Sequence, residues 1–384
     1  MAMLEEVSNI GAAIERLRAP VRQAQHAPGF IYNSHDHLAR EKENIFMQDW
    51  LFVALEQEVE NPGDYMTFRI LGEPVLITRD AEGNLNAFAN VCLHRGVEVA
   101  SGSGNLKEFM CPYHGWLYDL TGKLIGAPYM KEAEGFDPTN CNLKRLGIDT
   151  WRGYVFITFN DNPPAFADFI APLVKDVGYL HAEDVRIGNK IEMEFPCNWK
   201  FAVENLMDFY HVGVLHSDSF GQFFEWREDG VKLNERGGVY IKYTSASPTP
   251  EGKTQFRMLP WLEAAGETER FGCMAYLAPN MHVFGRCDVV RPIQLWPNGP
   301  DSTRAVIYHL FPPDWFNDPK FDEKCKIYRD YQIEVLEEDR SMLMSLQSAM
   351  GAREYSPGPM SHLEGPIHNT INYHVKRALG NGAD

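Results

Sequence analysis

The sequence predicts an α+β protein with two hydrophobic cores: an antiparallel β domain, followed by a region in which long helices cover an antiparallel sheet. Two cores are expected because the chain has 384 residues and single cores stop growing near about 250–300 residues. A folded chain is expected because 44% of the residues are hydrophobic and 23% are charged. The fold class follows from short β-type runs over about 48–160, after which helical and strand-like periodicities mix.

The N-terminal elements are expected to be helices. Residues 1–20 have amphipathic spacing, with acidic residues early and arginine late, and residues 36–47 predict a second helix. The start lacks the apolar run and cleavage site of a signal peptide, and no stretch approaches about 18 uninterrupted apolar residues. The seven cysteines are dispersed, unlike a disulfide framework. We therefore expect a cytoplasmic protein with no membrane association.

The β domain is expected over residues 48–162. Turn pairs such as Pro62-Gly63 and Thr121-Gly122 separate its β-type runs, and Pro163-Pro164 marks its end. The expected strands are 51–56, 65–70, 74–79, 84–89 and 154–159.

The second domain is expected over residues 163–384, and residues 1–47 are expected to pack on it. Alternating runs predict strands, and runs with a period near 3.6 residues predict helices. The expected strands are 187–195, 238–245, 273–278, 288–296 and 303–311, and the expected helices are 167–180, 198–211, 318–348 and 366–379.

The charge balance argues against nucleic acid as a partner. The chain has 36 Lys and Arg against 53 Asp and Glu, a net charge of −17. No basic cluster interrupts this balance, so phosphate-backbone binding has no electrostatic basis.

Two cysteines and two histidines form the first group of candidate metal ligands. Cys92 and His94 are separated by one residue, and Cys111 and His114 follow sixteen residues later with two residues between them. A glycine follows each histidine within two residues, which allows tight loops that present two ligands each. Zinc accepts this ligand set, although structural zinc prefers paired Cys-x2-4-Cys loops. Alternating Cys/His loops suit a cluster in which one iron takes both thiolates and the other takes both imidazoles.

The segments Cys-Leu-His-Arg-Gly at 92–96 and Cys-Pro-Tyr-His-Gly-Trp at 111–116 resemble the Rieske [2Fe–2S] signature. The resemblance implies that residues 48–162 are a Rieske domain with Cys92, His94, Cys111 and His114 as the cluster ligands. Neutral imidazoles in place of two thiolates raise the reduction potential of such a cluster.

A second group of candidate ligands lies in the helix expected over 198–211, where Asn198 is a plausible N-cap. Glu204, Asp208 and His211 lie at i, i+4 and i+7, along one helix face. His216 follows five residues later, about 140° away on a regular helix. Both imidazoles therefore face one metal only if the helix ends or bulges at Val212-Gly213. Two histidines and one carboxylate leave open positions, as in non-haem Fe(II) oxygenases, and Glu204 and Asp208 are the local candidates for the carboxylate.

The segment Glu-Asn-x2-Asp-x-Tyr-His-x4-His at 204–216 resembles the catalytic motif of Rieske-type ring-hydroxylating oxygenases, alpha subunits. The resemblance implies that the carboxylate ligand comes from a distant C-terminal helix and that Asp208 bridges the two metal centres. Residues 335–342 resemble the ligand helix of the family, with Asp339 as the ligand beside His211 and His216, and Glu338 as the fallback. It also implies a helix-grip (START-like) fold for the catalytic domain.

The resemblance implies a terminal oxygenase that uses O2 to hydroxylate or oxidatively demethylate a small, aromatic substrate, as in aromatic hydrocarbon catabolism. Electrons would come from NAD(P)H through a separate reductase, with or without a ferredoxin. The subunits would form a head-to-tail homotrimer in which each cluster faces the mononuclear Fe(II) of a neighbour. Two alternatives remain: a choline- or carnitine-like monooxygenase acting on quaternary ammonium, and a Rieske electron-transfer protein without catalysis. Four aromatic residues suit an aryl slot, a cation cage or the core: Phe220, Phe223, Phe224 and Trp226.

Overall fold

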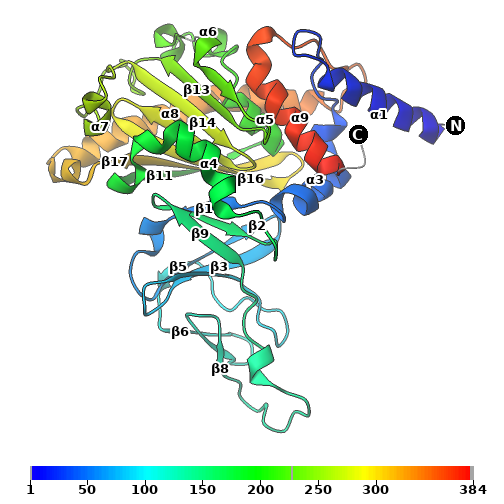
Figure 1. The fold of residues 1–384 in the computed structure, drawn as a ribbon, viewed down its shortest axis with the longest axis vertical. Helices are drawn as coiled ribbons and strands as arrows, with labels where there is room; N and C mark the ends of the chain where they lie inside the picture. Colours follow the sequence, from blue (N-terminus) through cyan, green and yellow to red (C-terminus); the bar gives the residue numbers. More distant parts are fainter. Residues whose placement is uncertain (1, 226–227, 381–384) are drawn as a thin grey trace. The chain divides into compact units, whose positions relative to one another are not determined.

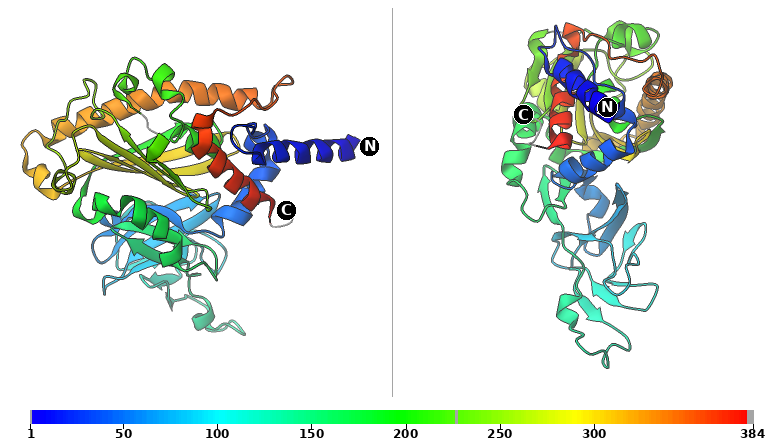
Figure 2. Two further views of the ribbon diagram at one scale, coloured as in Figure 1. Left: turned by 45° about the horizontal axis from the view of Figure 1, so that its top comes forward. Right: turned by 90° about the vertical axis from the view of Figure 1, so that its right-hand side faces the viewer.

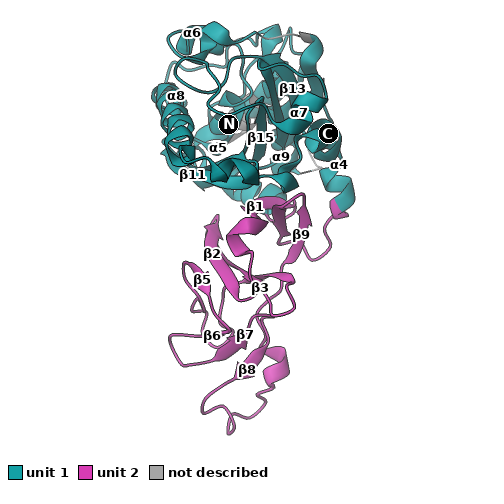
Figure 3. Ribbon diagram, turned by 90° about the vertical axis from the view of Figure 1, so that its left-hand side faces the viewer, with its two compact units in different colours: residues 1–46, 167–384 teal, residues 47–166 magenta. Residues whose placement is uncertain are grey.

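The computed structural model describes residues 2–225 and 228–380. They form two compact units, one spanning Met47–Phe166 and the other combining Met1–Phe46 with Ala167–Asp384 (Figure 3). The chain therefore leaves the larger unit after its first helices and returns to it after the β domain. The expected α+β class, with antiparallel sheets and long helices, is confirmed.

The smaller unit consists of three antiparallel sheets, with strand orders β1-β10-β9, β4-β3-β2-β5 and β6-β7-β8. The β6-β7-β8 sheet lies at the opposite end of this unit from β1 and β9 (Figure 3). The strands are β1 Leu51–Leu55, β2 Asp64–Ile70, β3 Glu73–Arg79, β4 Leu85–Ala89, β5 Ser103–Asn105, β6 Glu108–Met110, β7 Leu117–Asp119, β8 Leu124–Gly126, β9 Gly147–Trp151 and β10 Tyr154–Thr158.

The larger unit contains one seven-stranded antiparallel sheet in the order β11-β17-β16-β15-β14-β13-β12. Its strands are β11 Arg186–Phe195, β12 Val231–Leu233, β13 Val239–Thr244, β14 Phe271–Leu277, β15 Met281–Arg286, β16 Val289–Gly299 and β17 Ser302–Phe311. The helices of the chain are α1 Ala2–Arg18, α2 Phe30–Asn33, α3 His35–Glu41, α4 Phe166–Val177, α5 Trp199–Asn205, α6 Val212–Leu215, α7 Pro260–Ala264, α8 Phe321–Ala349 and α9 Gly365–Leu379.

The long helix α8 lies across one face of this sheet (Figures 1 and 2). Its buried side chains recur at intervals of three and four residues, which places them on one face of the helix. They include Cys325, Tyr328, Gln332, Val335, Asp339 and Leu343. Asp339 and Gln332 are therefore held on the apolar face, between the helix and the sheet.

The N-terminal segment packs on the larger unit, where a buried ion pair fixes it. Nζ of Lys200 on α5 lies 2.7 Å from Oε1 of Glu41 at the end of α3, and both side chains are at most 1% exposed. The indole nitrogen of Trp199 donates to Glu41 Oε2 at 2.8 Å. Burial alone would raise the pKa of Glu41, but Lys200 and His37 outweigh it and lower this pKa to about 2. Residues 42–46 continue α3 as a π-helical turn, so the helix expected over 36–47 is present but irregular.

We expect Glu41→Ala to lower the free energy of unfolding by about 3–5 kcal/mol, because it leaves the Lys200 ammonium buried without a partner. The double replacement Glu41→Leu with Lys200→Met should recover most of this loss, since no charge then remains buried. Denaturant unfolding measures both. The control Glu192→Ala removes an exposed carboxylate and should change stability by less than about 0.5 kcal/mol.

The same pair predicts a pH dependence. The folded pKa of Glu41 is below its ordinary value, so its stabilisation is complete above about pH 4.5 and is lost as the pH falls towards 2. The double variant should lack this component of acid sensitivity. A double variant as unstable as Glu41→Ala would contradict the explanation.

Candidate metal centres

Two loops of the smaller unit have the same backbone design. Cys92 and His94 follow β4, whereas Cys111 and His114 lie between β6 and β7. In each loop the cysteine N–H donates to the carbonyl five residues later, and its carbonyl accepts from a glycine N–H four residues later, at 2.7–3.0 Å. The two glycines, Gly96 and Gly115, have φ of 80° and 71°, which other residues adopt only with strain. The glycines are therefore needed to close both loops.

The four side chains form two pairs with different exposure. The thiols of Cys92 and Cys111 are 1% and 2% exposed and lie next to each other. The imidazoles face each other, with 3.1 Å between Nδ1 of His94 and Nδ1 of His114, on an exposed surface. Trp116 stacks on His94 with ring centroids 5.0 Å apart and connects the loop to the core of the unit.

This arrangement fits a two-iron cluster better than a single zinc ion. Around one ion, all four donor atoms would lie close together. Among the described residues, the groups of three or more possible metal-ligand atoms within 4.8 Å of one another contain none of these four residues. Burial raises the pKa of the Cys111 thiol, although backbone N–H groups of Tyr113 and His114 act against this. A buried thiol pair and an exposed imidazole pair match a cluster with an inner and an outer iron.

The helix expected over 198–211 is shorter than predicted. Helix α5 ends at Asn205, residues 206–211 consist of turns and irregular backbone, and α6 is a single turn over Val212–Leu215. The expected shared face of Glu204, Asp208 and His211 is therefore wrong. Asp208 accepts the backbone N–H of Tyr210 at 2.8 Å, the kind of local bond with which Asp competes against helix formation.

Glu204 is bound by the N-terminal segment of the chain. Its Oε1 accepts a hydrogen bond from the hydroxyl of Tyr32 on α2 at 2.9 Å. Burial raises the pKa of Glu204 to about 7. Of the two local candidates for a metal carboxylate, Glu204 is thus used to attach the N-terminal segment to α5.

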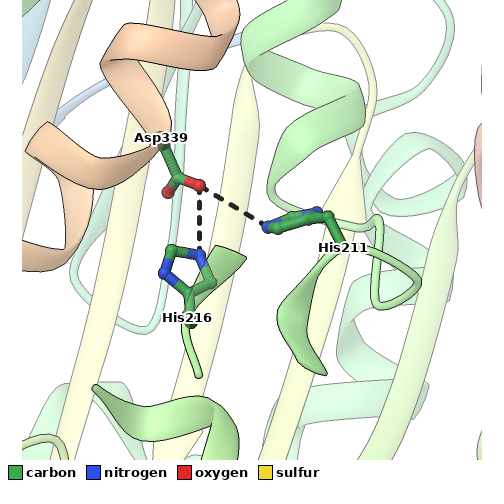
Figure 4. Close-up of side chains that lie close together, drawn as sticks. All are labelled: His211, His216 and Asp339. Atoms are coloured by element: carbon green, nitrogen blue, oxygen red, sulfur yellow. Dashed lines mark ion pairs between the residues drawn. The ribbon is translucent and has the colours of Figure 1, made fainter. Parts of the chain in front are cut away.

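His211, His216 and Asp339 converge on one point (Figure 4). The two histidines bracket α6, and Asp339 comes from α8. Asp339 Oδ1 lies 3.1 Å from His216 Nε2 and 3.5 Å from His211 Nε2. It is buried and accepts no hydrogen bond of normal geometry from the described residues. Ligands at about 2.1 Å from a metal and at right angles are about 3 Å apart, so these distances fit one divalent cation.

In each histidine, the ring nitrogen that does not face Asp339 lies beside a second carboxylate. Nδ1 of His211 lies 3.1 Å from Asp208 Oδ2, and Nδ1 of His216 lies 2.5 Å from Glu338 Oε2. Ser219 also donates to Glu338 at 2.9 Å. Such partners fix which ring nitrogen faces the metal. Burial would lower the pKa of His211, but the carboxylates of Asp208 and Asp339 raise it to about 9. These carboxylates therefore favour a positive charge at this point.

The sequence did not predict this use of Glu338, which it offered only as a second choice of ligand. Adjacent residues on a helix point about 100° apart, so Glu338 and Asp339 reach the same histidine from different sides. The adjacency of two carboxylates on the ligand helix was the available signal, and only the packing of α8 distinguishes their roles.

A cavity of about 100 Å³ adjoins the three side chains. Phe220 and Phe224 line it together with Phe209 and Tyr243, which the sequence did not single out. The ring of Phe223 lies beside Gly252 and is not part of the cavity wall. Trp226 lies outside the described residues. The group of His211, His216 and Asp339 thus has one side that opens to a mainly apolar cavity.

Comparison with protein families identifies both units. Residues 49–145 match the family described as the Rieske [2Fe-2S] domain, and residues 182–379 match the catalytic domain of the ring hydroxylating alpha subunit. The part of the chain that the structure describes contains no helix long and apolar enough to cross a membrane.

Two curated relatives and one solved structure show the extent of the similarity. The carnitine monooxygenase oxygenase subunit of Acinetobacter baumannii is 36% identical over 194 residues, 49% of this chain and 52% of that protein, so this match spans about half of its length. The corresponding subunit of Escherichia coli K12 is 32% identical over 347 residues, 89% of this chain and 88% of that protein. A quaternary ammonium Rieske monooxygenase, reported to oxidise carnitine and to transfer electrons between subunits, shares the fold with a TM-score of 0.76 at 24% identity, over 94% of this chain and 97% of that one.

We expect the purified protein to contain about three iron atoms and two acid-labile sulfides per chain, two of the irons from the cluster. Asp339→Ala should lose about one iron and keep the sulfide, because the cluster does not use this carboxylate. Elemental analysis and sulfide determination measure both. The matched control is Glu337→Ala, whose exposed carboxylate pairs with Arg340 on the same helix; it should keep all the iron.

Two results would contradict this assignment. If Glu338→Ala loses the third iron and Asp339→Ala keeps it, Glu338 is the ligand. Zinc without sulfide in the wild-type protein would exclude the cluster.

Proposed function

The chain belongs to the family of Rieske-type ring-hydroxylating oxygenase alpha subunits, and from this membership we propose that it is a terminal oxygenase that hydroxylates or oxidatively demethylates a small organic substrate. The observation that carries the proposal is the open-sided group of His211, His216 and Asp339 on the wall of a mainly apolar cavity. Cys92, His94, Cys111 and His114 are proposed to hold the [2Fe–2S] cluster. A purely electron-transferring Rieske protein would have no use for this second site.

The bound metals would supply single electrons from the cluster and O2 activation at the mononuclear iron. The residues of the chain contribute position and environment. Asp208 and Glu338 keep the Nδ1 protons of His211 and His216 in place, so that both Nε2 atoms face the iron position. Phe209, Phe220 and Phe224 exclude water from the space where substrate binds.

Electrons are proposed to come from NAD(P)H through a separate reductase, either directly or by way of a ferredoxin. Such a carrier would dock near His94 and His114, whose imidazoles are exposed in the single chain. None of the cysteines, all of which lie within the described residues, forms a disulfide, which fits a reducing cytoplasm as the proposed site of action.

The aromatic walls of the cavity favour an aromatic substrate. Phe209, Phe224 and Tyr243 lie with ring centroids 5.0–5.4 Å apart, a geometry suited to packing against an aryl ring. The second candidate is a quaternary ammonium compound, because the E. coli relative that matches most of the chain is a carnitine monooxygenase subunit. Aromatic faces also attract such cations.

The assembly is proposed to be a head-to-tail homotrimer in which Asp208 connects the cluster of one subunit to the iron of the next. The solved relative with inter-subunit electron transfer supports this arrangement. Heterologous contacts of this kind close into rings when the rotation permits.

Reduced protein should incorporate 18O from 18O2 into a product when it is supplied with a reductase, NAD(P)H and a panel of aryl carboxylates, aryl ethers and trimethylammonium compounds. Mass spectrometry identifies the product, or formaldehyde where a methyl group is removed. Asp339→Ala should lower turnover at least about 100-fold with the cluster still reducible, whereas Glu337→Ala should match wild type. Cluster reduction without product from any class would favour the electron-transfer alternative.

Mixed trimers test the path of the electron. His114→Ala subunits and His211→Ala subunits should each be inactive alone, because one lacks an intact cluster and the other an intact iron site. Co-expressed, they should regain part of the activity if electrons cross between chains, since some interfaces pair an intact cluster with an intact iron. Isolated mixed trimers without activity, or a monomer at working concentration, would exclude crossing.

A further inference from the structure

Two arginine side chains share the wall of the cavity beside the metal site. Arg286 is the last residue of β15 and Arg291 lies on β16. In the register of these strands Arg286 is opposite Val289 and Phe284 is opposite Arg291. Because side chains alternate between the faces of a sheet, both arginines project from the same face. Both line the cavity that His211, His216 and Asp339 adjoin.

Neutral groups hold both guanidinium groups in place. Arg286 is 4% exposed, lies over the ring of Tyr243 at 5.5 Å and donates a long bond of 3.5 Å to its hydroxyl. Arg291 lies over the ring of Phe284 at 5.3 Å and donates to the side-chain oxygen of Gln332 on α8. The Nε atoms of both arginines are buried without a hydrogen-bond partner. These contacts orient the cations but do not neutralise them.

Neither arginine forms an ion pair with a carboxylate of the described residues, although such a pair is the usual partner of a buried cation. The nearby acid is Asp288, in the turn between the two strands. Its Oδ2 already accepts hydrogen bonds from Ser247, at 2.8 Å, and from Tyr328. Burial raises the pKa of Asp288, and burial lowers the pKa of Arg291 to about 10. Asp288 therefore acts on Arg286 and Arg291 only through its charge. Because neither guanidinium group is bound directly by a carboxylate, both remain able to bind an anion from the cavity.

Helix α8 gives the separation between these arginines and the metal site. Gln332, Val335, Leu336 and Asp339 line the cavity and lie on one helix face at i, i+3, i+4 and i+7. Seven residues at 1.5 Å each place Gln332, the partner of Arg291, about 10 Å along the helix from Asp339. A small molecule with one end at the arginines thus reaches the metal site with the other.

We propose that the substrate is a carboxylate, whose carboxylate group Arg286 and Arg291 bind while its reacting carbon lies beside His211, His216 and Asp339. This inference rests on the proposed oxygenase function and narrows its substrate class. Guanidinium groups bind carboxylates through charge-assisted hydrogen bonds in a planar, often bidentate geometry. Aryl carboxylates and trimethylammonium carboxylates share this group, so both substrate candidates remain within the class. Analogues in which a primary amide replaces the carboxylate do not.

Equilibrium binding to the iron- and cluster-containing protein, without reductant, tests the proposal. Two matched pairs of probes serve: 4-methoxybenzoate with 4-methoxybenzamide, and 4-(trimethylammonio)butanoate with its primary amide. Calorimetric titration should show that, in at least one pair, the carboxylate binds at least about tenfold more tightly than the amide. The pair that discriminates identifies the aryl or the ammonium class.

Variants connect this preference to the arginines. Arg286→Gln and Arg291→Gln should each weaken carboxylate binding at least about tenfold and leave amide binding within about twofold. Arg286→Lys should give an intermediate loss, since it keeps the charge but not the planar fork. The matched control is Arg304→Gln, which removes a surface arginine near Glu192 and should bind as wild type does. Unchanged iron and sulfide contents show that each variant is folded.

Several outcomes would overturn the proposal: equal binding of carboxylate and amide in both pairs, a preference that survives both glutamine variants, or no binding of either carboxylate at about 10 mM. Tighter binding of 4-methoxyphenyl phosphate than of 4-methoxybenzoate would assign the site to phosphate esters instead. The binding experiment does not measure turnover, so it can contradict the carboxylate proposal independently of the oxygenase proposal. Selective carboxylate binding without oxygen incorporation would leave the arginine site intact and remove the oxygenase function.

Discussion

The larger unit depends on one geometric constraint: a single carboxylate oxygen of Asp339 must face the Nε2 atoms of two histidines. A continuous helix over 198–216 could not satisfy it, because residues five apart point in different directions. The chain solves this by ending α5 at Asn205 and forming the one-turn helix α6 between His211 and His216. Helix α8 must then pack on the sheet in one rotational setting, which its buried residues from Cys325 to Leu343 define. The end of α5 at Asn205 and the packing of α8 on the sheet therefore both serve to bring Asp339 to the two histidines.

A second requirement is that the short helix α5 be held firmly, since a helix of seven residues has little stability of its own. The N-terminal segment supplies the support. Glu41 binds Lys200 and Trp199 at the start of α5, and Tyr32 binds Glu204 near its end. Stacking of Tyr32 on Phe201, with centroids 3.9 Å apart, adds an apolar contact between these points. Residues that precede the inserted β unit in sequence thus position the segment that leads to the metal site.

The sequence predicted the features that depend on local patterns and left out those that depend on packing. All ten expected strands are present. The strands β5 to β8 and β12, of three residues each, carry too short a pattern to detect, and β9 and β15 were also not predicted. The spacing of Cys92, His94, Cys111 and His114 is a local signal, and so is the pair His211 and His216. The break after α5 includes a hydrogen bond from the backbone N–H of Tyr210 to the side chain of Asp208, a local bond that competes with good helix periodicity. The positions of Arg286 and Arg291 depend on strand register and on α8, so no sequence motif marks them.

The contacts of the two histidines with Asp208, Glu338 and Asp339 have a consequence for the order of events in the cavity. Without a metal His211 is protonated near neutral pH, because the carboxylates raise its pKa to about 9. The three carboxylates, this imidazolium and the guanidinium groups of Arg286 and Arg291 then have a formal sum of −3 + 1 + 2 = 0. A ferrous ion displaces this proton and changes the sum to 0 − 1 + 2 = +1, and a monoanionic ligand then brings it to zero. Fields of this kind are strong in a poorly hydrated cavity. Loading with a divalent cation therefore changes the site from one with no net charge to one that attracts an anion, and electroneutrality returns only when that anion is also bound.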